Sequence, residues 1–226
     1  GHGGKTLYIG SEVDNYNGGK HGSVAAYHIN PEDGSLSLIN QVDSQGAGPV
    51  YLSLTPSGDR LLVANYISGI VAAFPIDGSG KLGDASSVHQ DEGPAGAGKP
   101  AAAAEGSFAI SDHNGPHAHM IATDPSGKYV FSTDLGLDRI YQWKLNSSNG
   151  QLEANSPAFI NASSAGAGPR HFVFHPYGDV VFLVNEEASV LTSYHFDKAT
   201  GTLTQLHSLS TLPPNFKGTN FAAGIV

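Results

Sequence analysis

The stretch HMIATDPSGKYVFSTDLGLDRIYQW, residues 119–143, has two further versions in the chain, Val50–Phe74 and Arg170–Tyr194, which align with it without a gap. In each copy a Pro stands six positions after the first residue and a Gly stands two positions later. A short apolar run follows, then a second break, then a run that ends on an aromatic residue. Short β-prone runs separated by Pro and Gly predict antiparallel strands joined by tight turns.

Each copy continues to a Gly-x-Leu at Gly80, Gly150 or Gly201, which introduces a last strand. The repeating unit therefore has four antiparallel strands, which is typical of a β-propeller blade. The N-terminal residues form a partial copy that lacks its first strand and carries a ten-residue polar loop at 13–22. We predict an all-β fold, a β-propeller with about 3.5–4 of its blades in this chain.

The repeat divides one domain, residues 1–226, into predicted blades. Their ranges are 5–42 without its first strand, 50–90, 117–160, 170–210, and the start of a further blade at 221–226. The low-complexity segment around 91–115 is expected to be a surface loop between blades. An open ring exposes a sheet edge, so we expect this chain to be truncated, a part of a longer ring; a self-contained ring of four blades is the alternative.

Composition excludes several classes of function. The net charge is −9 and no two Lys or Arg residues are adjacent, which argues against a nucleic-acid or anionic-membrane surface. No apolar stretch approaches the roughly 18 residues that cross a bilayer. The chain has no cysteine, no Walker or dinucleotide-binding fingerprint and no Gly-x-Ser-x-Gly elbow, so we expect no cofactor. Compartment (cytoplasmic, periplasmic or secreted) and oligomeric state stay open.

Positions that break the repeat are the candidates for chemistry. At the first position of the three aligned copies stand Val50, His119 and Arg170. At the aligned position just after the second strand, the last copy has Glu186. Antiparallel strands return to the side they left, so His119, Arg170 and Glu186 should converge on one mouth of the central channel. We predict these three as catalytic residues. The alternatives are an Arg170 that only pairs with a carboxylate, a solvated Glu186 and a structural His119.

The densest polar cluster is DHNGPHAH, residues 112–119. His117 and His119 are two apart on a starting strand and could point to one side, which with Asp112 and His113 invites a metal site. Three or four convergent ligands would be needed, and no further pattern at ligand spacing supplies them, so we predict no metal. We predict substrate-binding roles for His117 and His171.

The motifs PHAHMIATDPSGKYVFSTDLGLDRI (116–140), AGAGPRHFVFHPYGDVVFLVNE (165–186) and LSTLPPNFKGTNFAAGIV (209–226) resemble the seven-bladed lactonase family, which includes propeller-type 6-phosphogluconolactonase and carboxy-muconate lactonizing enzyme. The resemblance implies seven blades. It also implies functional roles for His119, Arg170 and Glu186, and a further Arg beyond Val226. Two positions depart from the pattern that the resemblance implies: Asp112-His113 stands where many bacterial relatives carry Arg-Gln, and Gly224 stands where relatives often carry an acidic residue.

The function that this resemblance implies is lactonase activity, the hydrolysis of a sugar lactone such as 6-phosphogluconolactone, with a small-molecule lactone or carboxylated compound as partner. Glu186 or His119 would be the base, and Arg170 would hold an oxyanion, a carboxylate or a phosphate. A carboxy-muconate-type lactonizing enzyme and a non-catalytic propeller that binds a ligand or a protein are the alternatives.

Overall fold

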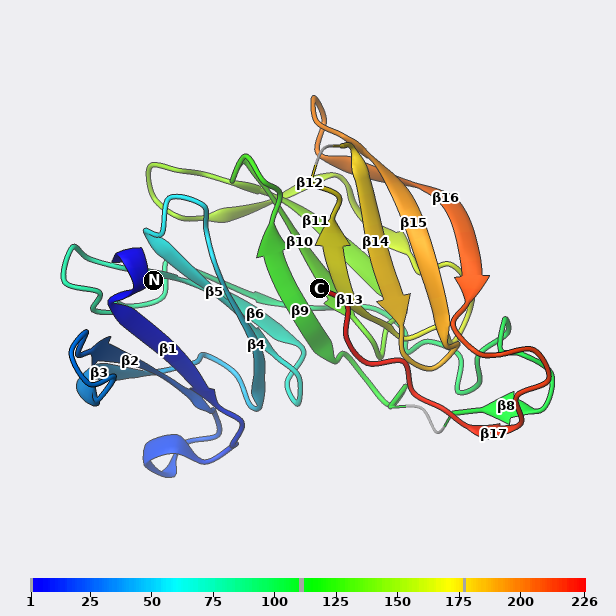
Figure 1. Ribbon diagram of the computed structural model, residues 1–226, viewed down its shortest axis with the longest axis horizontal. Helices are drawn as coiled ribbons and strands as arrows, with labels where there is room; N and C mark the ends of the chain where they lie inside the picture. Colours follow the sequence, from blue (N-terminus) through cyan, green and yellow to red (C-terminus); the bar gives the residue numbers. More distant parts are fainter. Residues whose placement is uncertain (1, 110–111, 177) are drawn as a thin grey trace.

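The computed structural model describes residues 2–109, 112–176 and 178–226, and they form antiparallel sheets arranged side by side in an arc (Figure 1). The predicted all-β, partial propeller fold is confirmed. Short 3₁₀ turns at His2–Gly4 (η1) and Tyr16–Gly18 (η2) are the helical elements of the described residues. None of the helices in this part of the chain has the length and apolar character needed to cross a membrane.

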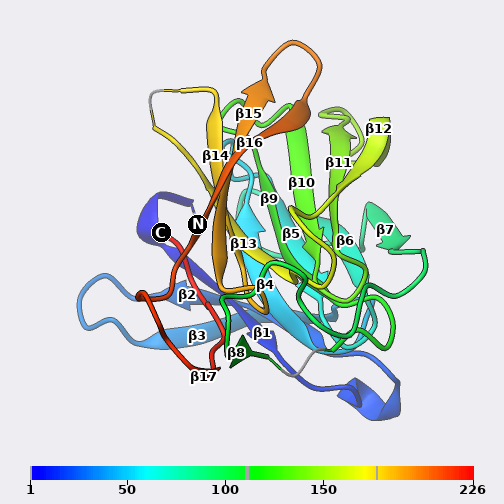
Figure 2. The same cartoon turned by 90° about the vertical axis from the view of Figure 1, so that its right-hand side faces the viewer.

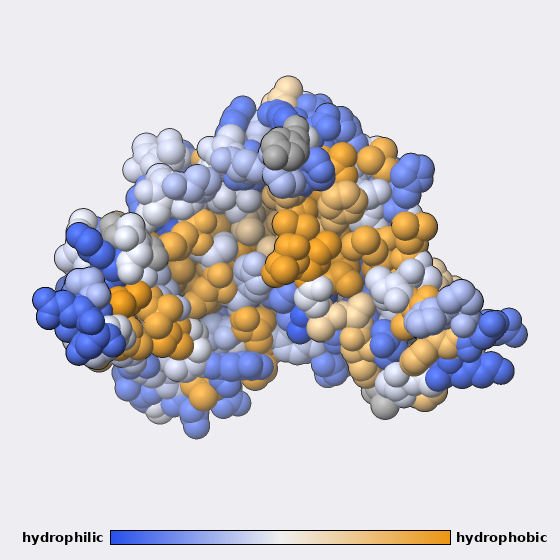
Figure 3. Space-filling model, viewed as in Figure 1, coloured by the Kyte–Doolittle hydropathy of each residue, from blue (hydrophilic) through white to orange (hydrophobic). Residues whose placement is uncertain are grey.

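The first sheet has three strands, in the order β1-β2-β3. They are β1 (Thr6–Ser11), β2 (Ser23–Ile29) and β3 (Leu36–Asp43). Among the described strands β1 pairs only with β2, and Leu7 and Ile9 on β1 are 38% and 40% exposed. Figure 3 shows apolar side chains gathered over this left-hand sheet and over the middle of the molecule.

Three four-stranded sheets follow, each in simple sequence order across the sheet. The second holds β4 (Pro49–Leu54), β5 (Arg60–Asn65), β6 (Ile70–Pro75) and β7 (Ser87–Gln90). The third holds β9 (Ala118–Thr123), β10 (Tyr129–Asp134), β11 (Arg139–Leu145) and β12 (Leu152–Asn161). The fourth holds β13 (Pro169–Phe174), β14 (Val180–Asn185), β15 (Val190–Asp197) and β16 (Thr202–Ser210). Contacts of β9 with both β4 and β13 place the first strands of these sheets side by side.

Apolar cores lie between neighbouring sheets of the arc. Between the third and fourth sheets the core is aromatic: Phe131 is 1% exposed and meets Phe196 edge to face, with ring centres 5.7 Å apart. Phe172 and Phe174 complete this cluster.

The Gly-x-Leu motif joins each sheet to the one before it. Gly201 has a φ of +71°, and a Cβ there would lie 2.0 Å from the ring of Tyr129, the first residue of β10. Two residues later, the Leu203 N–H donates to Gln142 Oε1 of β11 at 2.7 Å. In the same way, Gly80 lies against Thr6 at the start of β1, and Gly150 lies against Arg60 at the start of β5. The motif is therefore both a turn and an inter-blade contact.

Two predicted segments differ in the structure. The segment 91–115 is not only a surface loop: it carries β8 (Ser107–Phe108), which pairs in parallel with β17 (Gly218–Thr219), and Figure 2 shows both below the strands of the fourth sheet. Residues 221–226, predicted as the opening strand of a further blade, form no strand. A strand is defined by its ladder of hydrogen bonds, and the described chain supplies no ladder partner there.

Candidate functional site

The first position of each repeat lies at a β-bulge. Pro169 pairs with Asn185 and His171 with Val184, so Arg170 is the extra residue between them. His119 occupies the same position between the pairs Ala118–Asp134 and Met120–Thr133 of the third sheet. A bulge bends its strand and re-aims a side chain. Both bulges lie where β9 and β13 begin and β10 and β14 finish, and Figure 1 shows these strand ends at its lower side.

Arg170 and Glu186 form an ion pair across this end of the fourth sheet. Arg170 Nε lies 2.5 Å from Glu186 Oε2, and each side chain is 22% exposed. Arg170 Nη1 also donates to the Ala223 carbonyl, and the Ala222 N–H donates to the Glu186 carbonyl at 3.1 Å. Burial raises the pKa of Glu186, and the charge of Asp112 adds to this increase, although Arg170 opposes it. The result is a carboxylate held against a guanidinium with a pKa above the ordinary range.

His119 lies beside this pair and is almost sealed from solvent. It is 9% exposed, between the ring of Tyr66 at 5.4 Å and the ring of His171 at 5.1 Å. Burial lowers the pKa of His119 to about 3, and the charge of Arg170 and the neighbouring His171 add to this decrease. Its buried Nδ1 has no hydrogen-bond partner among the described residues. His119 is therefore a neutral imidazole at physiological pH.

The second predicted substrate-binding histidine, His171, is also neutral. Its ring meets the ring of Tyr51 edge to face, with centres 5.1 Å apart, and meets the ring of His119 at the same distance. Burial and the charge of Arg170 lower the pKa of His171 to about 4. The structure thus brings His119, His171, Arg170 and Glu186 together at one end of the sheets.

His117 connects two sheets instead of standing free. Its Nδ1 lies 3.1 Å from the Tyr66 carbonyl oxygen and its Nε2 2.6 Å from Asn114 Oδ1, while its ring stacks on that of Tyr66 at 4.6 Å. Both ring nitrogens therefore have protein partners. Its role in substrate binding stays a prediction.

The sequence reasoning missed Tyr66, which occupies the same repeat column as Glu186. Its hydroxyl donates to Asp112 Oδ2 at 2.7 Å. Burial and this carboxylate raise the pKa of the Tyr66 phenol far above its ordinary value. The signal was present in the alignment, because an aromatic phenol in that column is as distinct from Leu135 as a glutamate is.

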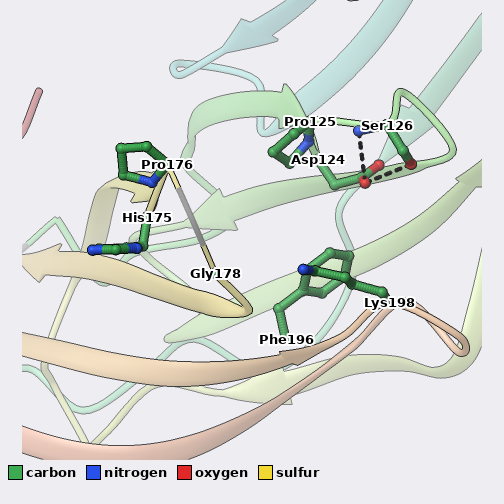
Figure 4. A pocket seen from close by; sticks show the side chains of 8 residues that line it. All are labelled: Asp124, Pro125, Ser126, His175, Pro176, Gly178, Phe196 and Lys198. Carbon is green, nitrogen blue, oxygen red and sulfur yellow. Dashed lines mark hydrogen bonds between the residues drawn. The ribbon is translucent and has the colours of Figure 1, made fainter.

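In the described ranges 2–109, 112–176 and 178–226, no group of three or more His, Asp or Glu side chains is arranged to hold a metal ion. A separate pocket of about 300 Å³ lies at the opposite ends of the strands (Figure 4). It is lined by Asp124, Pro125, Ser126, His175, Pro176, Gly178, Phe196 and Lys198. Asp124 follows the end of β9 and His175 follows the end of β13, so this pocket is remote from the bulges that carry His119 and Arg170.

Comparison with known proteins supports the family that the motifs suggest. The model of the lactonase family described as a 7-bladed β-propeller matches residues 2–226. The chain belongs to the seven-bladed β-propeller lactonase family. The 6-phosphogluconolactonase of Bacillus subtilis is 29% identical to this lactonase-family chain over 86% of the chain and 51% of its own length. That of Pectobacterium carotovorum is 30% identical, over 97% of the chain and 56% of its own length.

Among solved structures, the periplasmic gluconolactonase of Pseudomonas aeruginosa superposes with a TM-score of 0.77 at 27% identity, covering 94% of the chain and 56% of that protein. The chain thus spans about half the length of the lactonases it matches.

Proposed function

We propose that the protein hydrolyses a sugar lactone to the open hydroxy acid at the end of the sheets where Arg170 and Glu186 meet. The observation that carries this proposal is the 2.5 Å contact between Arg170 Nε and Glu186 Oε2, beside two neutral histidines. Membership of the lactonase family supports it, as do relatives named 6-phosphogluconolactonase.

Glu186 is the general base of the proposed reaction. The pKa of Glu186 is raised toward neutral pH, and a carboxylate with a higher pKa is a more effective general base. Glu186 takes a proton from water while the water oxygen attacks the lactone carbonyl carbon. When the tetrahedral intermediate collapses, the ring C–O bond breaks and Glu186 returns the proton to the departing ring oxygen. One lactone and one water give one hydroxy acid.

Arg170 stabilises the negative charge that develops on the carbonyl oxygen. Its guanidinium has five N–H donors. The contacts with Glu186 and Ala223 involve Nε and Nη1, which leaves further donors in the planar group for an oxyanion.

His119 fits the role of a neutral hydrogen-bonding group better than that of a base. A pKa of about 3 makes its imidazole a weak proton acceptor at neutral pH. Its buried Nδ1 lacks a partner among the described residues, and an unmade hydrogen bond of this kind has a free-energy cost that a bound hydroxyl or carbonyl group can remove. This favours Glu186 over His119 as the general base.

The test is direct hydrolysis by the intact protein of two substrates, 6-phosphogluconolactone and gluconolactone, with the uncatalysed rate subtracted. Turnover of either lactone above the buffer rate supports the proposal, and the ratio of the two kcat/KM values tells whether the phosphate is recognised. Rates equal to the buffer rate for both lactones would overturn it in favour of a ligand-binding propeller.

A further inference from the structure

His113, in the polar 112–119 cluster, is a buried histidine outside the site described above. Its side chain is 1% exposed. His113 Nδ1 lies 3.0 Å from Glu187 Oε2, and His113 Nε2 lies 3.2 Å from Asp138 Oδ1. By distance these contacts are ion pairs, and both carboxylates are themselves buried, at 2% and 11% exposure of their side chains. The imidazole therefore bridges two sheets, since Asp138 follows β10 and Glu187 follows β14.

Each carboxylate holds a segment of the proposed active site. Glu187 is the residue after Glu186, and its Oε1 accepts a hydrogen bond from the Asp112 N–H at 3.2 Å. Asp138 Oδ2 accepts from the Gly166 N–H at 2.6 Å and Oδ1 accepts from the Gly168 N–H at 3.0 Å. Gly166 and Gly168 belong to the loop that leads directly into Arg170. His113 thus connects the anchor of Glu186 to the anchor of Arg170.

The backbone of Gly96 packs directly against His113 and Asp138. A Cβ on Gly96 would lie 2.3 Å from His113 Cδ2 and 2.4 Å from Asp138 Oδ2. The Gly96 N–H donates to the Gly136 carbonyl at 2.8 Å, which fixes this part of the 91–115 segment over the imidazole. The packing of Gly96 therefore leaves no space for a larger residue beside the imidazole and its partner Asp138.

The charge state of His113 decides whether its contacts with Asp138 and Glu187 are favourable. Burial disfavours the imidazolium, but Asp138, Glu187 and the more distant Asp134 together outweigh burial and raise the pKa of His113. A buried charge pair that loses one partner leaves an uncompensated charge, which is strongly destabilising. Deprotonation of His113 would leave Asp138 and Glu187 facing each other across a neutral ring.

We propose that His113 is a positioning residue for the proposed lactonase reaction: as an imidazolium it fixes Glu187 and Asp138, and through them it sets the approach of Glu186 to Arg170. The proposal rests on the proposed function for its kinetic consequence, but its structural consequence is independent of catalysis. Among the described residues, the ion pairs of His113 are with Glu187 and Asp138, so it acts on Arg170 and Glu186 through these two carboxylates.

The sign of the pH dependence follows from the raised pKa. The stabilising charge is fully present below the ordinary histidine pKa of about 6.5 and is lost as pH rises through the higher pKa of the folded protein. The kinetic consequence is an alkaline limb: kcat falls at high pH because the Arg170–Glu186 geometry loosens, while KM changes less.

The experiment compares His113→Gln with His195→Gln in the intact protein. His195 also faces a carboxylate, Asp179 at 3.6 Å, but this pair is about half exposed, so it is a matched control. We expect His113→Gln to lower kcat by about tenfold or more, the scale seen when outer-shell partners of functional side chains are removed, and to lose the alkaline limb. His195→Gln should keep the wild-type kcat and pH profile.

A second readout does not need activity. The Nε–H resonance of Arg170, assigned by its loss in Arg170→Lys, reports the contact with Glu186 by NMR. In His113→Gln it should shift or broaden at neutral pH, and in wild type it should do so only as pH rises. An unchanged resonance in His113→Gln would overturn the positioning role even if the protein has no lactonase activity. An active wild type whose His113→Gln variant keeps the alkaline limb would overturn it as well.

Discussion

Arg170 Nε lies 2.5 Å from Glu186 Oε2, although the two residues belong to different strand ends of one sheet. The pairing of Pro169 with Asn185 sets this contact, because Arg170 and Glu186 are the residues that follow this pair on the two strands. A bulge at Arg170 then turns its side chain toward the end of the sheet. The proposed catalytic pair is therefore a property of one blade's own register, and the neighbouring blades add His119 and Tyr66 around it.

Replacing Glu186 by Gln should abolish most of the activity. The amide keeps the shape of the side chain but cannot accept the proton of the attacking water, so kcat should fall by about 10²–10⁴ with little change in KM. Steady-state hydrolysis of the lactone that the wild type turns over measures this. Glu153→Gln, at an exposed position of β12, is the control and should retain full activity. Equal rates for Glu186→Gln and wild type would rule out Glu186 as the base.

The pH profile should have an acid limb set by Glu186. A base must be deprotonated to act, so activity falls as pH drops through its raised pKa, above the ordinary value of about 4.3 for glutamate. Arg170→Gln removes the charge that lowers this pKa, so the limb should move to higher pH, while kcat/KM drops by about 10²–10³ from the lost oxyanion donor. Arg60→Gln, whose Arg pairs with Asp59 at 3.5 Å, should leave the limb in place. A limb that moves to lower pH in Arg170→Gln would contradict this electrostatic account.

His119 should remain neutral throughout the physiological range. With a pKa of about 3, its ring carbon resonances should not titrate between pH 8 and pH 5 in NMR spectra, whereas an ordinary histidine titrates near 6.5. Because the pKa of His119 is lower in the folded than in the unfolded protein, its contribution to folding stability is present above the unfolded pKa of about 6.5. This contribution is lost as the pH falls toward about 3. His119→Gln should therefore make unfolding less sensitive to acid. A His119 titration midpoint near 6.5 would contradict the buried, neutral imidazole.

The inter-blade contact of the Gly-x-Leu motif can be measured with two matched glycines. Gly201 and Gly34 have nearly the same φ, +71° and +73°, so replacement by Ala strains both backbones alike. A Cβ at Gly201 would collide with Tyr129, whereas Gly34 has nothing within 4 Å. Gly201→Ala should lower the free energy of unfolding by about 1–3 kcal/mol more than Gly34→Ala. Equal denaturation midpoints would show that this contact does not hold neighbouring sheets together.

The strands were predictable from sequence because each break has a local cause. Pro125 and Gly127 begin and complete the turn before β10, and the apolar run after them matches β10 at Tyr129–Asp134. The column comparison also placed Arg170 and Glu186 at one end of a sheet, because antiparallel pairing fixes which strand ends meet. The repeat did not predict the extra residue at each bulge. A bulge is recognised only from the register of two paired strands, and neither strand's sequence specifies that register by itself.

The role of His113 was out of reach of the sequence for a different reason. Its partners Asp138 and Glu187 lie far along the chain in other blades, so neither spacing nor periodicity joins them to the 112–119 cluster. The sequence left a solvated position open for Glu186, yet the adjacent Glu187 is 3% exposed. The low-complexity composition of 91–115 likewise indicated a free loop, because nothing in it encodes the packing of Gly96 against the imidazole.

The parallel pairing of β8 with β17 ties together two segments that lie outside the repeated strands. One of them supplies Asp112 and His113, and the other touches Arg170 and Glu186 through Ala223 and Ala222. The segments that surround the proposed catalytic pair therefore lie outside the repeated strands that carry it. We expect insertions and exchanges in these two segments to change which lactone the proposed site binds while every sheet keeps its register.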